Sequence, residues 1–212
     1  NTDDLMTFIL IFITAVVSVS CLKNRTWFER LALVPYRTVH RREWYRAVTY
    51  GFVHGDNMHL IVNMFVLLSF GQHIERMFTA YQHAGTIMSS YLTYGLLYFG
   101  GLVAAAAPDI VRKRNDPHYA SIGASGAVAA VVFTSIFFNP WSKIYFFGIV
   151  PIPGIVFGIL YLGYEQYMNR RQTRDGINHN AHLWGSLFGF VFPILVDPSL
   201  WNVFVQNLLN RP

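Results

Sequence analysis

The sequence has 212 residues, of which 53% are hydrophobic and only 13% are charged. Because soluble domains carry about 25% charged residues, this composition argues against a soluble protein and indicates a chain that crosses a membrane several times. The net charge is +5, but the basic residues lie in loops between apolar runs, where they set orientation and contact anionic lipid. No nucleic-acid motif is present, and a single cysteine, Cys21, excludes an internal disulfide.

Six apolar segments predict an all-α membrane protein, a six-transmembrane-helix bundle folded as one domain over residues 1–212. The predicted spans are 5–22, 58–76, 82–107, 120–138, 144–167 and 180–196. The first run follows two aspartates and lacks a basic region, which favours a retained anchor over a cleaved signal peptide. The long first loop, 23–57, mixes aromatic residues with arginines, which predicts a folded segment in the membrane interface.

Polar residues stand near the start of every second span. Six spans place the starts of the second, fourth and sixth on one side of the membrane. The second carries His59 and Asn63, which are four residues apart and share a helix face. The fourth carries Ser125 and the sixth carries His182. At about 1.5 Å per residue these side chains lie at similar depth, and polar groups inside a membrane indicate a functional site because they are costly there.

This combination predicts nucleophilic catalysis. His182 can act as the base that activates Ser125, while His59, Asn63 and the Ser125 backbone N–H can stabilise an oxyanion. A hydrogen bond between side chains on two helices needs close helix packing, which small residues permit. The fourth and sixth spans supply small residues at Gly123, Gly126, Gly185 and Gly189.

Each residue alone has a simpler explanation. A serine between glycines is typical of helix packing, and a membrane histidine often bonds a neighbouring helix or lines a pore. His59 and Asn63 could also bond each other, so the joint placement carries the argument. The acidic residues lie at termini, in loops or near span ends, which favours a Ser–His dyad over a triad. Without an HExxH motif or an aspartate pair inside the spans, no metal and no cofactor are predicted.

Three motifs, taken together, resemble the rhomboid intramembrane serine proteases. They are HLIVN in the second span, GASG in the fourth and AHLWGSLFG in the sixth, in the family's order. The resemblance implies a rhomboid-like six-helix core and a Ser125–His182 dyad, with His59, Asn63 and the Ser125 N–H at the oxyanion. It also implies that the partners are transmembrane protein substrates in the lipid bilayer, and a bacterial inner or cell membrane is the expected location.

Two further stretches bear on this resemblance. In EWYRAV, Arg46 stands where the family has a Trp–Arg pair and Tyr45 replaces the tryptophan; Arg46 and His54 are expected to support the site. Ala129 stands four residues after the serine, where family members often have an aromatic ring stacked on the catalytic imidazole.

The VPIPG stretch of the fifth span predicts a bend, because proline and glycine break helices. Its simple interpretation is a kink; the functional hypothesis is a mobile gate at Pro151 and Pro153. Orientation stays open. Most lysines and arginines lie in loops on the side of the dyad, which the positive-inside rule assigns to the cytoplasm, whereas bacterial rhomboids typically open to the outside.

Two other function classes compete with the protease. A catalytically inactive rhomboid-like protein would bind transmembrane helices without cutting them; Ala129 favours it, while retention of both Ser125 and His182 disfavours it. A transporter or channel would use the histidines as ion relays. Such a path needs polar residues on both sides of the membrane, but here they gather on one.

Overall fold

The computed structural model describes residues 4–146, 148–171 and 175–211. These residues are mostly helical, with one short β-hairpin. In chain order the elements are α1 (Leu5–Lys23), α2 (Arg25–Leu31), α3 (Pro35–His40), α4 (Arg46–Thr49), the 3-10 helix η2 (Tyr50–Phe52), α5 (Asn57–His83), α6 (Ser90–Arg112), α7 (Ser125–Phe138), β1 (Lys143–Phe146), β2 (Val150–Pro153), α8 (Gly154–Arg171), α9 (His179–Val196) and α10 (Leu200–Leu209).

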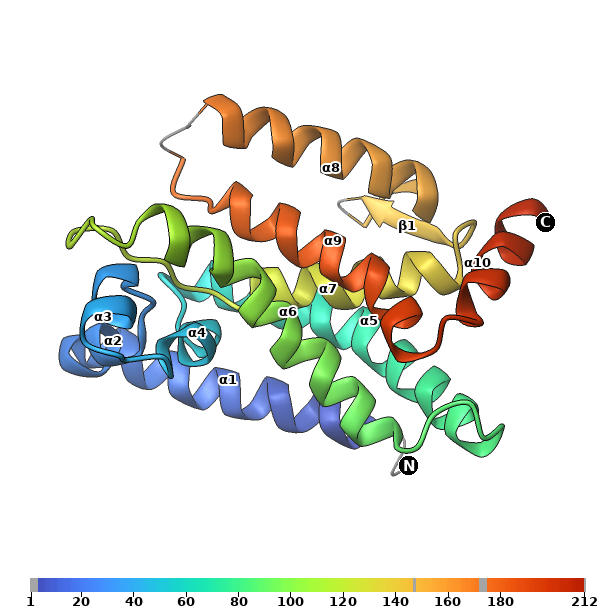
Figure 1. The fold of residues 1–212 in the computed structure, drawn as a ribbon, viewed down its shortest axis with the longest axis horizontal. Coiled ribbons are helices and arrows are strands. Elements are labelled where there is room, and N and C mark those ends of the chain that lie inside the picture. Colours follow the sequence, from blue (N-terminus) through green and yellow to red (C-terminus); the bar gives the residue numbers. More distant parts are fainter. Residues whose placement is uncertain (1–3, 147, 172–174, 212) are drawn as a thin grey trace.

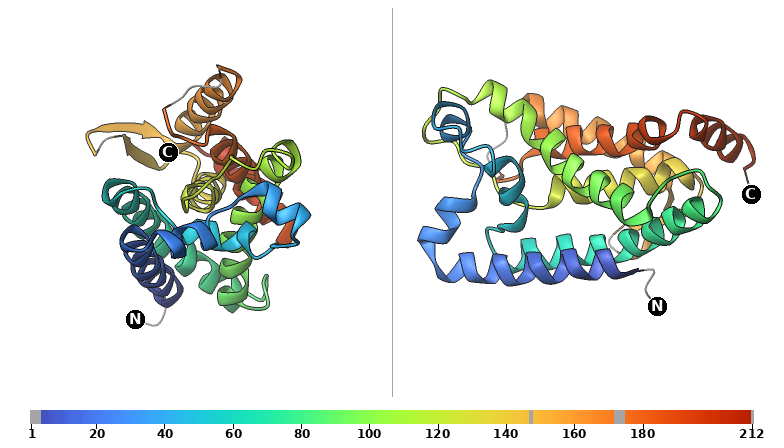
Figure 2. Two further views of the ribbon diagram at one scale, coloured as in Figure 1. Left: turned by 90° about the vertical axis from the view of Figure 1, so that its left-hand side faces the viewer. Right: turned by 60° about the horizontal axis from the view of Figure 1, so that its bottom comes forward.

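Helix α7 lies at the centre of the molecule. Every residue from Gly126 to Phe138 is buried, as expected for a helix that is apolar on all sides. It packs most extensively against α9 and then against α6 and α5, and the end-on view in Figure 2 shows it surrounded by the other helices. Figure 1 shows α8 along one edge, beyond α9, and α1 along the opposite edge.

The structure corrects the fifth predicted span, 144–167. Residues 144–146 and 150–153 lie in the two strands of the antiparallel β1–β2 hairpin, in which Tyr145 pairs with Pro151 and Lys143 with Pro153. Proline disfavours helical backbone in the preceding residue, so a V-P-I-P run stays extended. The prediction of a bent helix here was wrong: both prolines lie in a strand, and α8 begins after them at Gly154.

Other boundaries also differ. The fourth predicted span begins at Ser125 instead of residue 120, because the residues before it are extended and Ser121 pairs with Leu33. The second reaches His83, and the third is shifted to Ser90–Arg112. Helix α10, bent 119° from α9, was not predicted. The predicted loop 23–57 is folded into short helices.

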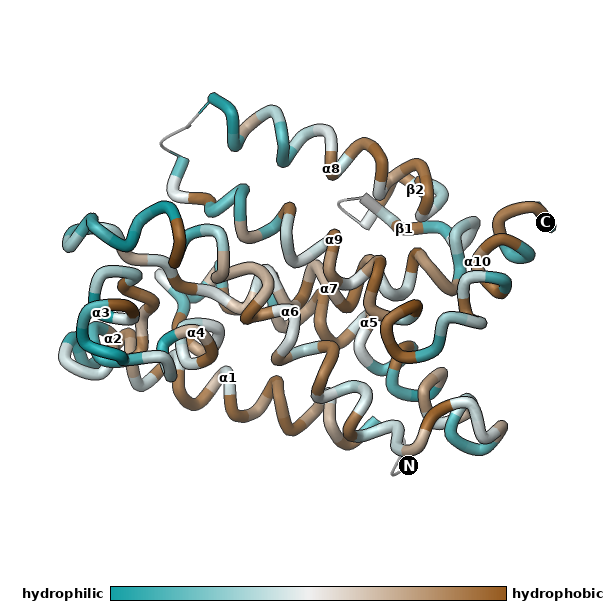
Figure 3. Tube along the Cα trace, viewed as in Figure 1, coloured by the Kyte–Doolittle hydropathy of each residue, from teal (hydrophilic) through white to brown (hydrophobic). Residues whose placement is uncertain are grey.

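Within the described residues, α1 and α6 are long and apolar enough to cross a membrane, and α9 with α10 makes a third candidate if the bent pair counts as one. Helix α7 is apolar but shorter, so the count of six spans stays a prediction. Figure 3 shows hydrophilic positions gathered where α2, α3 and the C-terminal end of α8 lie, while α1 is hydrophobic along its length.

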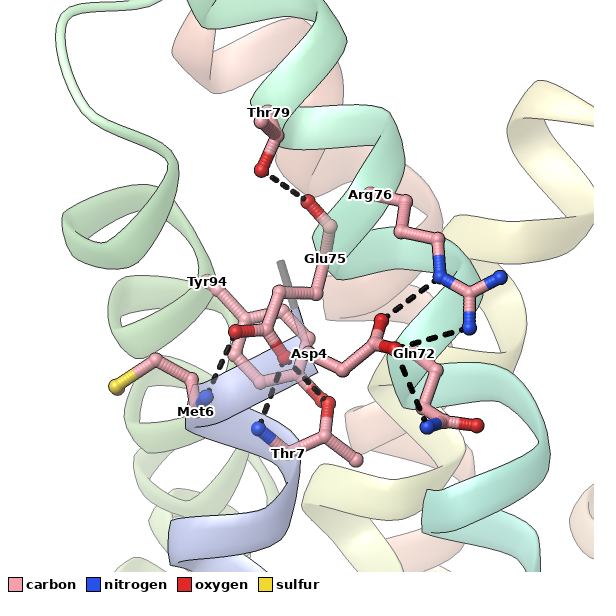
Figure 4. A network of polar contacts seen from close by, with 8 residues as sticks. All are labelled: Asp4, Met6, Thr7, Gln72, Glu75, Arg76, Thr79 and Tyr94. Carbon is pink, nitrogen blue, oxygen red and sulfur yellow. Dashed lines mark hydrogen bonds and ion pairs between the residues drawn. The ribbon is translucent and has the colours of Figure 1, made fainter. Parts of the chain in front are cut away.

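A buried carboxylate holds the start of α1 against α5 (Figure 4). Glu75 accepts hydrogen bonds from the backbone N–H groups of Met6, at 2.7 Å, and Thr7, at 2.9 Å. The first N–H groups of a helix have no partner within the helix, and a negative charge there is favourable. Beside it, Asp4 forms an ion pair with Arg76 at 2.8 Å. These contacts lie about 24 Å along α5 from His59.

Candidate active site

A large cleft of about 2260 Å³ opens where several helix ends meet. The first turns of α5, α7 and α9 and the C-terminal end of α6 line it, and it continues along α8 from Phe157 to Arg170 and reaches the hairpin at Tyr145 and Gly148. His59, Asn63, Ser125 and His182 are all among its lining residues. The structure therefore brings together the four polar residues that the sequence placed at three separate helix starts.

Ser125 is the first residue of α7, and its side chain is partly buried. The backbone before it is held at two points: Gly123 N–H donates to the Tyr50 carbonyl at 3.0 Å, and Ala124 N–H donates to His54 Nε2 at 3.4 Å. Because the first N–H groups of a helix lack intrahelical acceptors, this end of α7 can receive a developing negative charge.

Gly123 makes room where two predicted site residues converge. Its φ of +115° lies in a region that favours glycine. A Cβ on this residue would lie 3.1 Å from His59 Nε2 and 3.7 Å from Ser125 Oγ. Gly123 thus lies in the loop before α7, so its predicted role in helix packing was wrong, and its missing side chain leaves space between His59 and Ser125.

The other three predicted glycines lie at helix contacts. A Cβ on Gly185 would collide with the carbonyl oxygen of Gly126, and one on Gly189 would collide with that of Ala130. A Cβ on Gly126 would meet Ala105 of α6. Helices α7 and α9 therefore approach as closely as their backbones allow, and this sets the distance between the Ser125 and His182 backbones.

The imidazole of His182 is held by α8. Its Nδ1 lies 3.0 Å from Glu165 Oε1, and the Tyr161 ring lies nearly parallel to it, at 23° with 6.5 Å between centroids. This aromatic neighbour comes from α8, whereas α7 has Ala129 at the position four residues after Ser125. Among the described residues no hydrogen bond joins Ser125 Oγ to His182, although both side chains line the cleft.

Glu165 is a site residue that the sequence analysis missed. It was grouped with acids near span ends, but its side chain is only 3% exposed and touches both His182 and His179. Tyr161 and Glu165 are four residues apart and so share one face of α8. That spacing, in an otherwise apolar segment, was the available signal, but nothing in the sequence gave the partner of this face.

The predicted oxyanion donors lie on the first turns of α5. His59 N–H donates to Asp56 Oδ1 at 2.7 Å, which caps the helix. Asn63 Nδ2 donates to the His59 carbonyl at 2.9 Å; since a side-chain amide carries two N–H groups, one remains for a ligand.

The residues expected to support the site are both buried. His54 contacts the backbone just before Ser125, as described above. The Arg46 guanidinium pairs with Glu43 and donates to the carbonyls of Glu29 and Ala32 at 2.8 and 2.7 Å. Arg46 therefore stabilises the folded first loop, and it is not among the residues that line the cleft.

Asp109 of α6 is a second residue that the sequence analysis missed. Its carboxylate accepts from Tyr119 Oη at 2.7 Å and from the amides of Asn178 and Asn180 at 2.6 and 2.9 Å. These bonds join the loop before α7 to the start of α9. They hold the loop that precedes Ser125 in place relative to α9, the helix that carries His182.

Comparison with known proteins agrees with this architecture. A family model described as the Rhomboid domain matches residues 41–198. RHOMBOID-like protein 12, mitochondrial, from Arabidopsis thaliana is 28% identical over 66% of this chain and 42% of its own length. Rhomboid-related protein 2 from Mus musculus is 26% identical over 81% and 53%. RHOMBOID-like protein 4 from Arabidopsis thaliana is 30% identical over 76% and 37%. The chain thus spans about half, or less, of the length of these relatives.

Proposed function

Because this chain belongs to the rhomboid family, we propose that it is an intramembrane serine endopeptidase that cleaves transmembrane segments of membrane proteins. One observation carries the proposal: Ser125 and His182 line the same cleft from two helices whose glycines bring the backbones into contact. His59 and Asn63 line that cleft from a third helix.

The residues divide the reaction as follows. His182 takes the proton from Ser125 Oγ while that oxygen attacks the scissile carbonyl. The oxyanion accepts hydrogen bonds from the Ser125 backbone N–H, His59 and Asn63. His182 then gives its proton to the leaving amine, which leaves an acyl-enzyme on Ser125. Water entering through the cleft, deprotonated by His182, hydrolyses this ester and frees the serine.

Substrate binding supplies the contact that the resting site lacks. Catalytic hydrogen bonds are often long without substrate and tighten only in the reacting complex. Helices α7 and α9, which carry Ser125 and His182, are already in backbone contact at Gly126 and Gly185. The hairpin prolines Pro151 and Pro153 stay candidates for a gate, now as part of a strand pair beside the cleft.

We place six helices, α1, α5, α6, α7, α8 and α9, across the bilayer, with the cleft opening at one membrane surface. Six spans are more than the strongly apolar helices alone would give, because α5 and α8 carry polar residues that face the cleft. The expected bacterial membrane receives no support from the relatives, which include proteins named mitochondrial and chloroplastic.

Reaction with a fluorophosphonate probe tests the proposal. The detergent-solubilised wild type should label at Ser125, while Ser125→Ala should not label and His182→Gln should label at least about 100-fold more slowly, since general-base catalysis is lost. Cleavage of a reconstituted transmembrane substrate should fall in parallel. A correctly folded wild type that neither labels nor cleaves would reject the protease and favour an inactive, helix-binding rhomboid-like protein, which Ala129 and the unformed Ser125–His182 bond would then explain.

A further inference from the structure

A continuous chain of polar contacts runs behind His182. Glu165 Oε1 lies 3.0 Å from His182 Nδ1, and Glu165 Oε2 lies 2.6 Å from His179 Nδ1. On the far side of the ring, His179 Nε2 lies 3.0 Å from Asp175 Oδ2. Glu165 and His179 are almost completely buried, at 3% and 4% exposed. A carboxylate this buried requires such partners, because an unpaired charge would be very costly there.

The contact with Glu165 selects one tautomer of His182. An ionised carboxylate only accepts hydrogen bonds, so the imidazole proton must sit on Nδ1 when the ring is neutral. Nε2 then carries the free lone pair and can take a proton from Ser125. The same carboxylate stabilises the imidazolium that forms when this proton arrives.

His179 holds Glu165 in this position. Both ring nitrogens of His179 face carboxylate oxygens, so the protonated ring can donate to both at once. One oxygen of Glu165 is thereby fixed on His179 and the other is directed at His182. Tyr161, one turn earlier on α8, flanks the His182 ring.

We propose that Glu165 is a positioning residue that completes a Ser125–His182–Glu165 triad, with α8 supplying the carboxylate that orients the base. This inference rests on the proposed protease function. It explains how His182 is oriented in a chain that has Ala129 where an aromatic ring would otherwise stack. The rival explanation is that the Glu165 contacts only hold α8 against α9. In that case they affect the stability of the protein but not the orientation or basicity of His182.

The pH profile separates the two explanations. The titratable groups around His182 are Glu165 and Tyr161 from α8, His179 from its own helix and His59 from α5, and Ser125 of α7 lines the same cleft. Of these, only the Glu165 carboxylate carries a negative charge in contact with the ring. Its removal disfavours the imidazolium, so the acid limb of the rate profile should move to lower pH. If Glu165 only held α8 against α9, the acid limb of the rate profile would not move.

The experiment measures the rate of fluorophosphonate labelling of Ser125 against pH in four detergent-solubilised proteins: the wild type, Glu165→Gln, Glu165→Asp and Glu29→Gln. Thermal unfolding is recorded for each. Glu165→Gln should label about 100-fold or more slowly, with its acid limb at lower pH. Glu165→Asp keeps the charge and should label at an intermediate rate with the limb unmoved. Glu29→Gln removes an exposed carboxylate that pairs with Arg25 and should match the wild type.

A folded Glu165→Gln protein with the wild-type rate and pH profile would overturn the triad. Should that variant fail to fold, the wild type still gives an answer by proton NMR with labelled histidine. A strongly downfield imidazole proton that disappears in His182→Gln is expected for a His182 Nδ1–H bonded to a carboxylate, and its absence would also overturn the inference. A wild type that shows this proton but never labels would refute the protease and leave the Glu165 contact standing.

Discussion

His54 has no exposed surface, and both of its ring nitrogens have partners. The Ala124 N–H can only donate, so His54 Nε2, 3.4 Å away, must accept. The proton therefore sits on Nδ1, where the Ser18 hydroxyl, at 3.2 Å, accepts it. Protonation of the ring would place a second donor against the Ala124 N–H. The backbone just before Ser125 thus depends on His54 remaining neutral.

Burial lowers the pKa of His54 to about 3, and the nearby His59 ring acts in the same direction, while Asp56 opposes it. The unfolded chain binds this proton first, at its ordinary pKa near 6.5. The free energy of unfolding should therefore fall as pH drops from about 6.5 toward 3, with a loss of about 2 kcal/mol from this residue at pH 5. His54→Gln, whose amide oxygen can accept from Ala124, does not titrate.

Thermal unfolding in detergent at pH 7.5 and pH 5 checks this. The wild type should be more stable than His54→Gln at pH 7.5, and the difference in stability between the two proteins should be smaller at pH 5. An advantage that stays the same at both pH values would contradict the assignment.

At the scale of elements, the contact between α7 and α9 leaves no room for an added side chain at Gly185. A Cβ on Gly185 would meet backbone atoms of Gly126, which cannot rotate away as a side chain could. Gly185→Ala should therefore push the helices apart and lower the free energy of unfolding by about 1–3 kcal/mol. Because the same movement separates Ser125 from His182, labelling by the probe should slow as well.

Gly95→Ala is the matched control, since a Cβ there meets no atom within 4 Å. Replacing a helical glycine by alanine without a clash should raise stability by about 0.5–1 kcal/mol. Thermal unfolding and labelling rates are compared across the two variants. If Gly185→Ala behaves like Gly95→Ala, the close packing of α7 and α9 is not required for the site.

The elements also show what sequence alone can and cannot provide. Small residues and polar helix starts predicted that α5, α7 and α9 would meet at one site. These signals can be read from the sequence itself, since helical spacing shows which residues share a face and the number of spans shows which helices start on the same side of the membrane. The apolar run at 143–153 carries no period that separates strand from helix, so only the prolines hinted at the hairpin. Glu165 was missed for another reason: its meaning depends on contacts with His179 and His182, and such tertiary partners leave no trace in the spacing of one helix.

At the scale of the whole molecule, the proposed active site lies far from the contacts that anchor α1. The cleft collects the polar starts of three helices, whereas the Glu75 and Asp4 contacts fasten α1 to α5 far along the bundle (Figure 4). Between them lies the apolar packing around α7. Stability can therefore be lowered from the far end without moving the groups that line the cleft.

Glu75→Gln tests this separation. Glu75 accepts from two backbone N–H groups and from Thr7 Oγ1, at 2.7–2.9 Å; an amide has one acceptor oxygen and would turn an N–H toward a remaining donor. The variant should lose about 1–3 kcal/mol of stability, as expected when buried donors lose their acceptor. Below its unfolding temperature it should label Ser125 at the wild-type rate, with Glu29→Gln as the charge control. Slower labelling by the folded variant would mean that the start of α1 is coupled to the proposed dyad of Ser125 and His182, and the two ends of the bundle would then act as one unit.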